Sequence, residues 1–397
     1  MKQSKKSSIL ESLTLAALAL PLMQTANAGR VDENYHTDFQ YGHYSESNQR
    51  MSVDIFEGSL SAPIGKAITA SLNVVQDVIS GASPVYNQRD AKGHIQQVIS
   101  GASGHALTSG ASCKASICDE RTAVTPTFTY AFDNASVGLS GGYSTENDYT
   151  SRYVSSNLSW DINKKLTTLN FSASGAFDEL NPTAYEGGFM RNRECGDKCS
   201  KTSQQYLFGI SQILDKHSLI QSNMTFAYHN GFLSDPYKQV TMAHTLAWSP
   251  TPFYYPVDEH RPRERFEWAW LTQYVRHFGN LNDAALHIDY RFSDNDWAIQ
   301  SHTAELSWHQ PIAAGWQIVP RVRYYSQNAA NFYQAIFDNS DYQFYSSDYR
   351  LAGFGAVSVG LKLSKDFTEI KHINSLKFQA GIEYYDRKSD YQIGGNS

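Results

Sequence analysis

An alternation of apolar and polar residues with a period of two runs through most of the chain and constrains its fold more than any other feature. In segment 169–177, Leu169, Phe171 and Phe177 occupy odd positions, and Asn170 and Ser172 occupy even ones. Successive side chains of a strand point to opposite faces, so this pattern predicts strands with one apolar and one polar face.

Fifteen segments carry this pattern, at 35–45, 50–61, 67–79, 121–132, 135–145, 150–162, 166–178, 203–214, 218–229, 263–277, 283–293, 297–310, 316–327, 348–363 and 374–387. Short turns follow the even-numbered segments. Most links after odd-numbered segments are longer and polar, notably 80–120, 179–202, 230–262 and 328–347. Short periplasmic turns that alternate with long extracellular loops are typical of outer-membrane barrels.

A globular β-sandwich would also alternate, but it has no reason to keep this order of short and long links. The 25 Tyr, 20 Phe and 7 Trp make up 13% of residues, and outer-membrane barrels need such side chains as girdles at both membrane interfaces. We therefore predict an all-β fold, a transmembrane antiparallel up-and-down β-barrel of about 16 strands. Outer-membrane lipid and lipopolysaccharide would surround it.

The first 28 residues read as a cleavable signal peptide, with Lys2, Lys5 and Lys6 before an apolar stretch and Ala26-Asn27-Ala28 at the cleavage site. The barrel is expected in 29–397, in the outer membrane of a Gram-negative cell. Removal of three Lys and one Glu lowers the net charge from −6 to −8, which argues against nucleic-acid binding.

Fifteen strands would leave the chain at the outer face, whereas single-chain bacterial barrels have an even count. The sequence also ends on Gly394-Gly395-Asn396-Ser397, without the terminal aromatic residue that the barrel-assembly machinery usually reads. We expect either that one strand is missing or that the count is wrong by one.

A repeat lies in the first long loop, where the sequence from Gln76 to Ser83 returns with small changes from Gln96 to Ser103. Gly and Ser permit tight turns, so the repeat predicts a hairpin above the membrane. The alternative is a backbone nest that binds an anion.

Four cysteines form two close pairs, Cys113 with Cys118 and Cys195 with Cys199. An even count in an oxidising exterior favours disulfides, with three connectivities open. A metal site with His105, Asp119 and Glu194 as further ligands is the alternative, and we expect neither a metal nor a cofactor.

Charged residues on the polar faces of neighbouring strands are the candidate functional set. They are Arg263, Arg265, Glu267, His287, Asp289, Arg291, Glu305, His309, Arg321 and Arg323. They can form ion pairs that stiffen the barrel. They can also form an Arg-rich wall that attracts small anions, and the two roles are compatible.

A hydrolase in the wall needs a Ser and a His within hydrogen-bond reach. Ser301 and His302 point to opposite faces, and Ser307 and His309 lie about 7 Å apart along one face, so both pairs are weak candidates and we expect no enzyme.

Six stretches resemble DUF3570, a family of uncharacterised bacterial proteins predicted to be outer-membrane barrels. They are DVISGASP at 77–84, DER at 119–121, RPRER at 261–265, YRFSDNDW at 290–297 with HT at 302–303, PRVRYYSQ at 320–327 with FY at 332–333, and SDYRL at 347–351. The resemblance covers most of the mature chain. It implies barrel and location without an activity, and neither the cysteine pairs nor the missing strand fits its pattern.

A barrel of this size normally encloses an aqueous channel, so passage of small polar or anionic solutes is the leading function. The loops at 80–120 and 230–262 could fold inward as a constriction. The alternative is a non-conducting receptor or scaffold of an envelope complex, with the Tyr-rich loop 328–347 binding a partner. The oligomeric state stays open.

Overall fold

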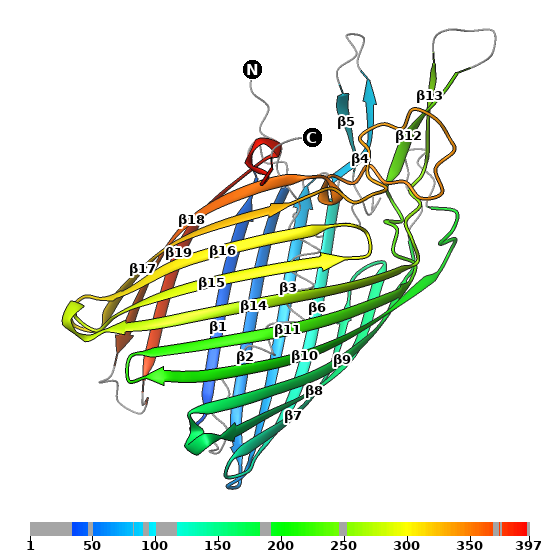
Figure 1. The fold of residues 1–397 in the computed structure, drawn as a ribbon. Coiled ribbons are helices and arrows are strands. Elements are labelled where there is room, and N and C mark those ends of the chain that lie inside the picture. The colour runs from blue at the N-terminus through cyan, green and yellow to red at the C-terminus, as the bar shows by residue number, and fades with distance from the viewer. Residues whose placement is uncertain are drawn as a thin grey trace.

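The computed structural model describes residues 34–46, 51–81, 83–89, 95–100, 117–182, 192–245, 252–367, 373 and 375–394. In this part of the chain, fifteen antiparallel strands form one sheet that curves into a barrel (Figure 1). Each strand pairs with its neighbours in chain order, and β1 and β19 stand at the two ends of that order. The predicted up-and-down architecture with fifteen visible strands is confirmed.

The fifteen strands are β1 (His36–Ser45), β2 (Met51–Ile64), β3 (Ile68–Gly81), β6 (Ile117–Ala131), β7 (Ala135–Thr145), β8 (Tyr149–Ile162), β9 (Thr167–Leu180), β10 (Cys199–Asp215), β11 (Ser218–Gly231), β14 (Glu264–Phe278), β15 (Ala284–Asn295), β16 (Gln300–Pro311), β17 (Trp316–Gln327), β18 (Phe354–Phe367) and β19 (Leu376–Lys388). Two hairpins are separate, β4 (Ser83–Arg89) with β5 (Ile95–Ser100) and β12 (Gln239–His244) with β13 (Phe253–Asp258). Short 3-10 turns are η3 (Asn163–Lys165), η4 (Gly279–Leu281), η5 (Tyr349–Leu351) and η6 (Ser389–Tyr391).

The outer face of the barrel is apolar. Leu306, Val322 and Ile288 are 49%, 48% and 43% exposed, and each alternates with polar or charged neighbours on the opposite face. An apolar outer band with a polar interior is the pattern of a transmembrane barrel. The described residues contain no helix that is both long enough and apolar enough to span a membrane.

The turns at one end of the barrel are short, such as 132–134, 163–166 and 216–217. Asn163, Lys164 and Asn282 adopt positive φ angles there, which suits tight turns. The described parts of the four long links lie at the other end. The β4–β5 hairpin joins the first repeat copy to the second, with Ser83 opposite Ser100, as the hairpin interpretation predicts.

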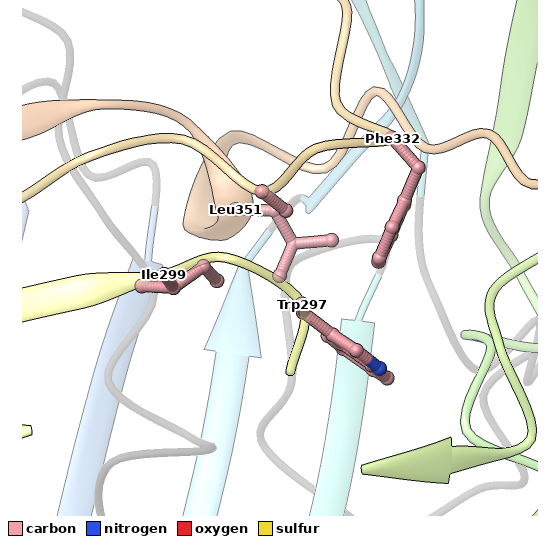
Figure 2. Packing of buried hydrophobic residues seen from close by; sticks show 5 residues of the cluster. Trp297, Ile299, Phe332 and Leu351 are labelled. Atoms are coloured by element: carbon pink, nitrogen blue, oxygen red, sulfur yellow. The ribbon is translucent and has the colours of Figure 1, made fainter. Parts of the chain in front are cut away.

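Two predicted strands begin at least three residues later than expected. β18 begins at Phe354 rather than 348, because Tyr349–Leu351 form a 3-10 turn in which the Asp348 carboxylate accepts a hydrogen bond from the Arg350 N–H at 3.0 Å. β16 begins at Gln300 rather than 297, because Trp297 and Ile299 leave the ladder and pack with Phe332 and Leu351 (Figure 2).

The hydrophobic core lies mainly above the barrel, at the end with the long links. Besides the Trp297 cluster, Val240, Met242 and Phe337 are buried together, joining β12 to the loop 328–353. We call the packed parts of 232–263 and 328–353 the outer cap. The described parts of both hairpins stand above the end of the barrel (Figure 1), so the structure does not place them in the lumen as the predicted constriction.

Candidate functional site

Nine of the ten predicted charged residues lie on the inner face of four adjacent strands. Strand register places Asp289 opposite Glu305 and Glu305 opposite Arg323, whereas their sequence neighbours Ile288, Leu306 and Val322 are exposed on the outer face. The nine residues are Arg265 and Glu267 on β14, His287, Asp289 and Arg291 on β15, Glu305 and His309 on β16, and Arg321 and Arg323 on β17.

Arg263 is the exception. It precedes β14, its side chain is 64% exposed, and its guanidinium lies 3.7 Å from the Glu194 carboxylate in the loop 181–198. The structure therefore places Arg263 among the outer loops, because the inner wall begins only where β14 enters the sheet.

Some of these charges form ion pairs along the wall. Arg265 lies 2.5 Å from Glu267, and Arg321 lies 3.5 Å from Glu305. Arg321 also pairs with Glu383 of β19, a residue outside the predicted set. Asp289 accepts a hydrogen bond from Gln273 at 3.2 Å. These contacts stiffen the wall between β14 and β19.

Three cations on the inner face have no ion-pair partner among the described residues. They are Arg291 on β15, Arg323 on β17 and Lys362 on β18, and all three are exposed. Register puts Lys362 opposite Val319, itself on the inner face, although sequence analysis did not select it. The sequence does indicate its position, because Lys362 stands between Leu361 and Leu363 and so falls on the polar face of the alternating pattern.

The opposite half of the inner wall is almost uncharged along its middle. Strands β7–β11 present hydroxyl and amide side chains there, such as Ser140, Ser159 and Asn170. Ser159 donates a hydrogen bond to Asn170 at 2.7 Å, and Ser140 lies 2.8 Å from Thr127. Between the two halves, Asp77 and Arg121, which belong to two of the stretches that resemble the family, form a partly buried ion pair. The wall is thus polar throughout, with free positive charge gathered on one side.

The outer cap contains a second charged cluster, and this one is buried. Asp348 is completely buried and lies 2.7 Å from Arg261 and 3.6 Å from Lys238, and it also contacts Arg350. Burial alone would raise the pKa of Asp348, but the neighbouring charges of Arg350, Lys238 and Arg261 hold that pKa well below its usual range.

Other acidic residues complete this cluster. Glu259 lies 2.9 Å from Arg261 and accepts a hydrogen bond from the Asp235 N–H at 2.8 Å. Asp235 in turn lies 3.2 Å from Arg350. The cluster unites RPRER and SDYRL, two of the stretches that carry the family resemblance, although 86 residues of other sequence and more than one strand separate Arg261 from Asp348. Sequence reasoning missed it, because irregular loops carry no periodicity from which contacts can be predicted.

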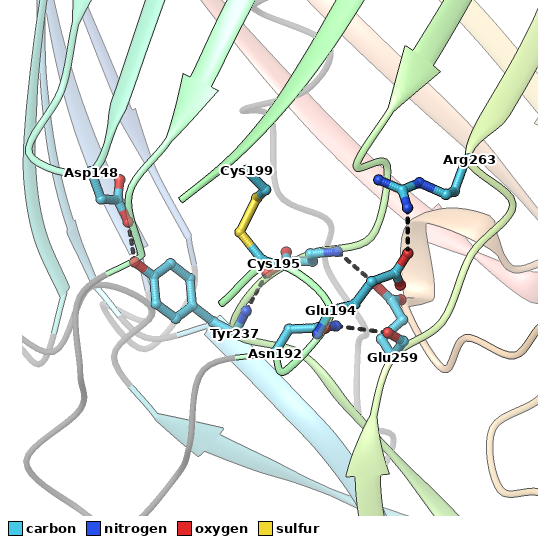
Figure 3. The surroundings of a disulfide bond; sticks show 9 residues. Asp148, Asn192, Glu194, Cys195, Cys199, Tyr237, Glu259 and Arg263 are labelled. Carbon is cyan, nitrogen blue, oxygen red and sulfur yellow. Dashed lines mark hydrogen bonds and ion pairs between the residues drawn. A yellow bond between two sulfur atoms is a disulfide. The ribbon is translucent and has the colours of Figure 1, made fainter. Parts of the chain in front are cut away.

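One predicted cysteine pair is bonded: Cys195 and Cys199 form a disulfide at the base of the loop 181–198 (Figure 3). Beside it, Asn192 donates a hydrogen bond to the backbone oxygen of Glu259 at 2.8 Å, and Glu194 lies 2.9 Å from His260. These contacts tie the loop to the outer cap. Cys113 and the side chain of Cys118 lie outside the described residues, as do His105 and the side chain of Asp119.

The two Ser–His pairs differ in whether the serine and the histidine share a face of the sheet. Ser307 Oγ lies 3.4 Å from His309 Nε2, closer than the backbone spacing implies, because the imidazole reaches back along the strand. No carboxylate among the described residues is hydrogen-bonded to that ring. His302 points outward and lies 2.8 Å from the Tyr290 hydroxyl, while Ser301 contacts Ser293 on the inner face.

The fold and the wall together define a class: a transmembrane β-barrel of the outer-membrane type with a polar, partly charged interior. The family model described as "Protein of unknown function (DUF3570)" matches residues 10–397, so the chain belongs to that family, as the resemblance predicted. Among curated proteins, none matches the chain in sequence.

Several solved outer-membrane proteins are similar in structure. OccD3 (OpdP) of Pseudomonas aeruginosa is 11% identical with a TM-score of 0.42, and the match covers 93% of this chain and 90% of that one. The anion-selective porin of Comamonas acidovorans is 9% identical with a TM-score of 0.36, covering 83% and 99%. The siderophore receptor PirA of Pseudomonas aeruginosa is 8% identical with a TM-score of 0.39, covering 92% of this chain. This chain spans 56% of the receptor's length.

Proposed function

We propose that the protein is an outer-membrane channel, without enzymatic activity, for small anionic solutes. The observation that carries this proposal is the group of exposed cations, Arg291, Arg323 and Lys362, on one side of the inner wall. Cations without a bound carboxylate keep their charge available to a passing solute, and rings or stripes of Arg and Lys favour anions in pores. The uncharged half supplies hydroxyl and amide groups that replace part of a solute's hydration shell.

Charge reversal tests the proposal. The Arg291→Glu, Arg323→Glu double variant should shift the reversal potential in a salt gradient from the anion side towards the cation side in planar bilayers. Arg152→Glu is the control, because it makes one such Arg-to-Glu replacement on the exposed outer face of β8. A conducting barrel whose reversal potential stays unchanged in the double variant would contradict the assignment of the anion path to these residues.

A receptor or scaffold is the second candidate, favoured by the outer cap. The β12–β13 hairpin carries Phe253 and Tyr254, which are 61% and 39% exposed, on a base held by buried ion pairs. A folded barrel that never conducts would support this candidate over the channel. Deleting the hairpin tip would then be expected to abolish partner capture without unfolding the barrel.

A further inference from the structure

Two histidines meet on the inner face at the end of the barrel with the short turns. His217 lies in the β10–β11 turn and His277 near the end of β14, and their backbones are joined by a hydrogen bond from His277 N–H to His217 O at 2.8 Å. Their rings are parallel within 18°, and the two Nδ1 atoms lie 3.4 Å apart. Two imidazole nitrogens therefore face each other without another side chain between them.

That separation suits a shared metal ion. With metal–nitrogen bonds of about 2.0–2.1 Å and a tetrahedral angle, two ligating nitrogens are about 3.4 Å apart. The rings now meet nearly head on, as in an N–H···N hydrogen bond. A rotation of each ring by about 35° would make both lone pairs converge on one ion with a tetrahedral angle. Imidazole is a preferred ligand of zinc, copper and nickel.

A carboxylate already orients one of the rings. Asp283 Oδ1 lies 3.2 Å from Nε2 of His277, which places the ring proton on Nε2 and leaves Nδ1 with its lone pair. A carboxylate on the far nitrogen of a histidine ligand is the usual support of a metal site. The His277 side chain is 40% exposed, so an ion can reach it from solution.

The surrounding wall is also rich in imidazole. Register places His277 opposite Ala285 and Ala285 opposite His309, and the His309 ring lies 4.2 Å from that of His287. Four of the ten histidines in the described part of the chain thus line one strip of the inner face. Unlike the first pair, the second pair has no carboxylate hydrogen-bonded to either ring among the described residues.

We propose that His217 and His277 bind a divalent transition-metal ion of the zinc or copper type at this mouth of the barrel, with Asp283 as the positioning residue. Each histidine contributes Nδ1 as a neutral imidazole. The proton between the two nitrogens leaves Nδ1 of His217 as that ring takes up a proton from solvent at Nε2. Water completes the coordination, since no group of three or more His, Cys, Asp or Glu side chains within the described ranges is arranged to hold a metal. The proposal is independent of conduction.

Zinc titration of the refolded barrel, prepared without a histidine tag, tests the site. In a calorimeter at about pH 7.5, where free imidazole is neutral, we expect about one zinc ion per chain. His217→Gln and His277→Gln should each abolish this binding. Asp283→Asn should weaken it about 10–100-fold. The control His302→Gln changes a histidine on the outer face and should bind zinc like the unchanged protein.

Copper spectroscopy separates metal ligation by the two histidines from a purely structural role of these residues. The electron paramagnetic resonance spectrum of bound Cu²⁺ should show two coupled imidazole nitrogens, and His277→Gln should lose that signal. The site is refuted if the unchanged barrel takes up no zinc, or if His277→Gln and His302→Gln bind it equally. A barrel that binds zinc but does not conduct would overturn only the proposed channel.

Discussion

Asp348 is a single carboxylate on which the outer cap depends. It is completely buried, and Arg261, Lys238 and Arg350 all direct positive charge towards it. An ion cluster of this kind adds little net stability when intact, because desolvation opposes the attraction. Removing its central anion is destabilising, because three cations would then remain around a neutral side chain.

Asp348→Asn should destabilise the cap by about 3–5 kcal/mol, the range found when one member of a buried ion pair is removed. Limited proteolysis should then cut 232–263 and 328–353, while the barrel keeps its heat-modifiable mobility on gels. The control Asp341→Asn changes an exposed carboxylate of the same loop and should be nearly neutral. Equal protease resistance in the two variants would show that the cap does not depend on the cluster.

The depressed pKa of Asp348 predicts how the cap responds to pH. A carboxylate whose pKa is lower in the folded state stabilises that state above its unfolded pKa of about 3.9, and the stability is lost as pH falls through the folded value. Hydrogen exchange in the cap should therefore stay slow down to about pH 4 and rise only in stronger acid. Loss of protection already near pH 6 would rule out Asp348 as the titrating group.

At the level of elements, the upper end of β11 depends on one backbone conformation. Gly231 has a φ of +122°, a region that other residues rarely adopt. A Cβ there would meet the carbonyl oxygen of Ser200 and lie 2.8 Å from Cα of Lys201 on β10. The strand can thus bend towards the cap only because position 231 lacks a side chain.

Gly231→Ala should lower the free energy of unfolding by about 1–3 kcal/mol, through backbone strain and the clash with β10. Urea unfolding of the refolded barrel measures the change. Gly58→Ala on β2 is the control, because its Cβ would meet nothing within 4 Å and its φ is not positive. Similar losses in both variants would mean that the φ of Gly231 is not the cause.

The loop 181–198 depends on its disulfide, which joins residues four apart. Closing so short a loop contributes about 2 kcal/mol by constraining the unfolded chain. The intact mass without reductant should be lower than the reduced mass by two hydrogen atoms for each bridge. Replacing Cys195 and Cys199 by Ser should speed hydrogen exchange in 192–198 and leave β9 and β10 protected. Free thiols with retained metal would instead favour the metal alternative for the cysteines.

Across the whole molecule, charge is distributed unevenly. The free cations lie on β15, β17 and β18, while the wall from β7 to β11 is nearly neutral along its middle. A solute in the lumen therefore meets an electrostatic field from one side only. The screening length of salt water sets how far that field reaches.

The anion preference of the channel should weaken as salt rises. The Debye length falls from about 10 Å at 0.1 M to about 3 Å at 1 M salt, so cations on one side of the wall lose influence on the other side. Reversal potentials in equal-ratio gradients at low and high salt measure this change. A preference independent of salt would indicate selection by size or direct contact rather than by this field.

The sequence alone determined the strands, their faces and the family. The alternation is a local property, because successive side chains of a strand point to opposite faces. The inner position of residues such as Asp289 and Arg323 could therefore be predicted from the sequence. Only the tertiary structure determined which charged residues form ion pairs. It also placed Arg263 among the outer loops and brought Arg261 into contact with Asp348. Those outcomes depend on register between strands and on loops that pack far apart in sequence, and no local period encodes either.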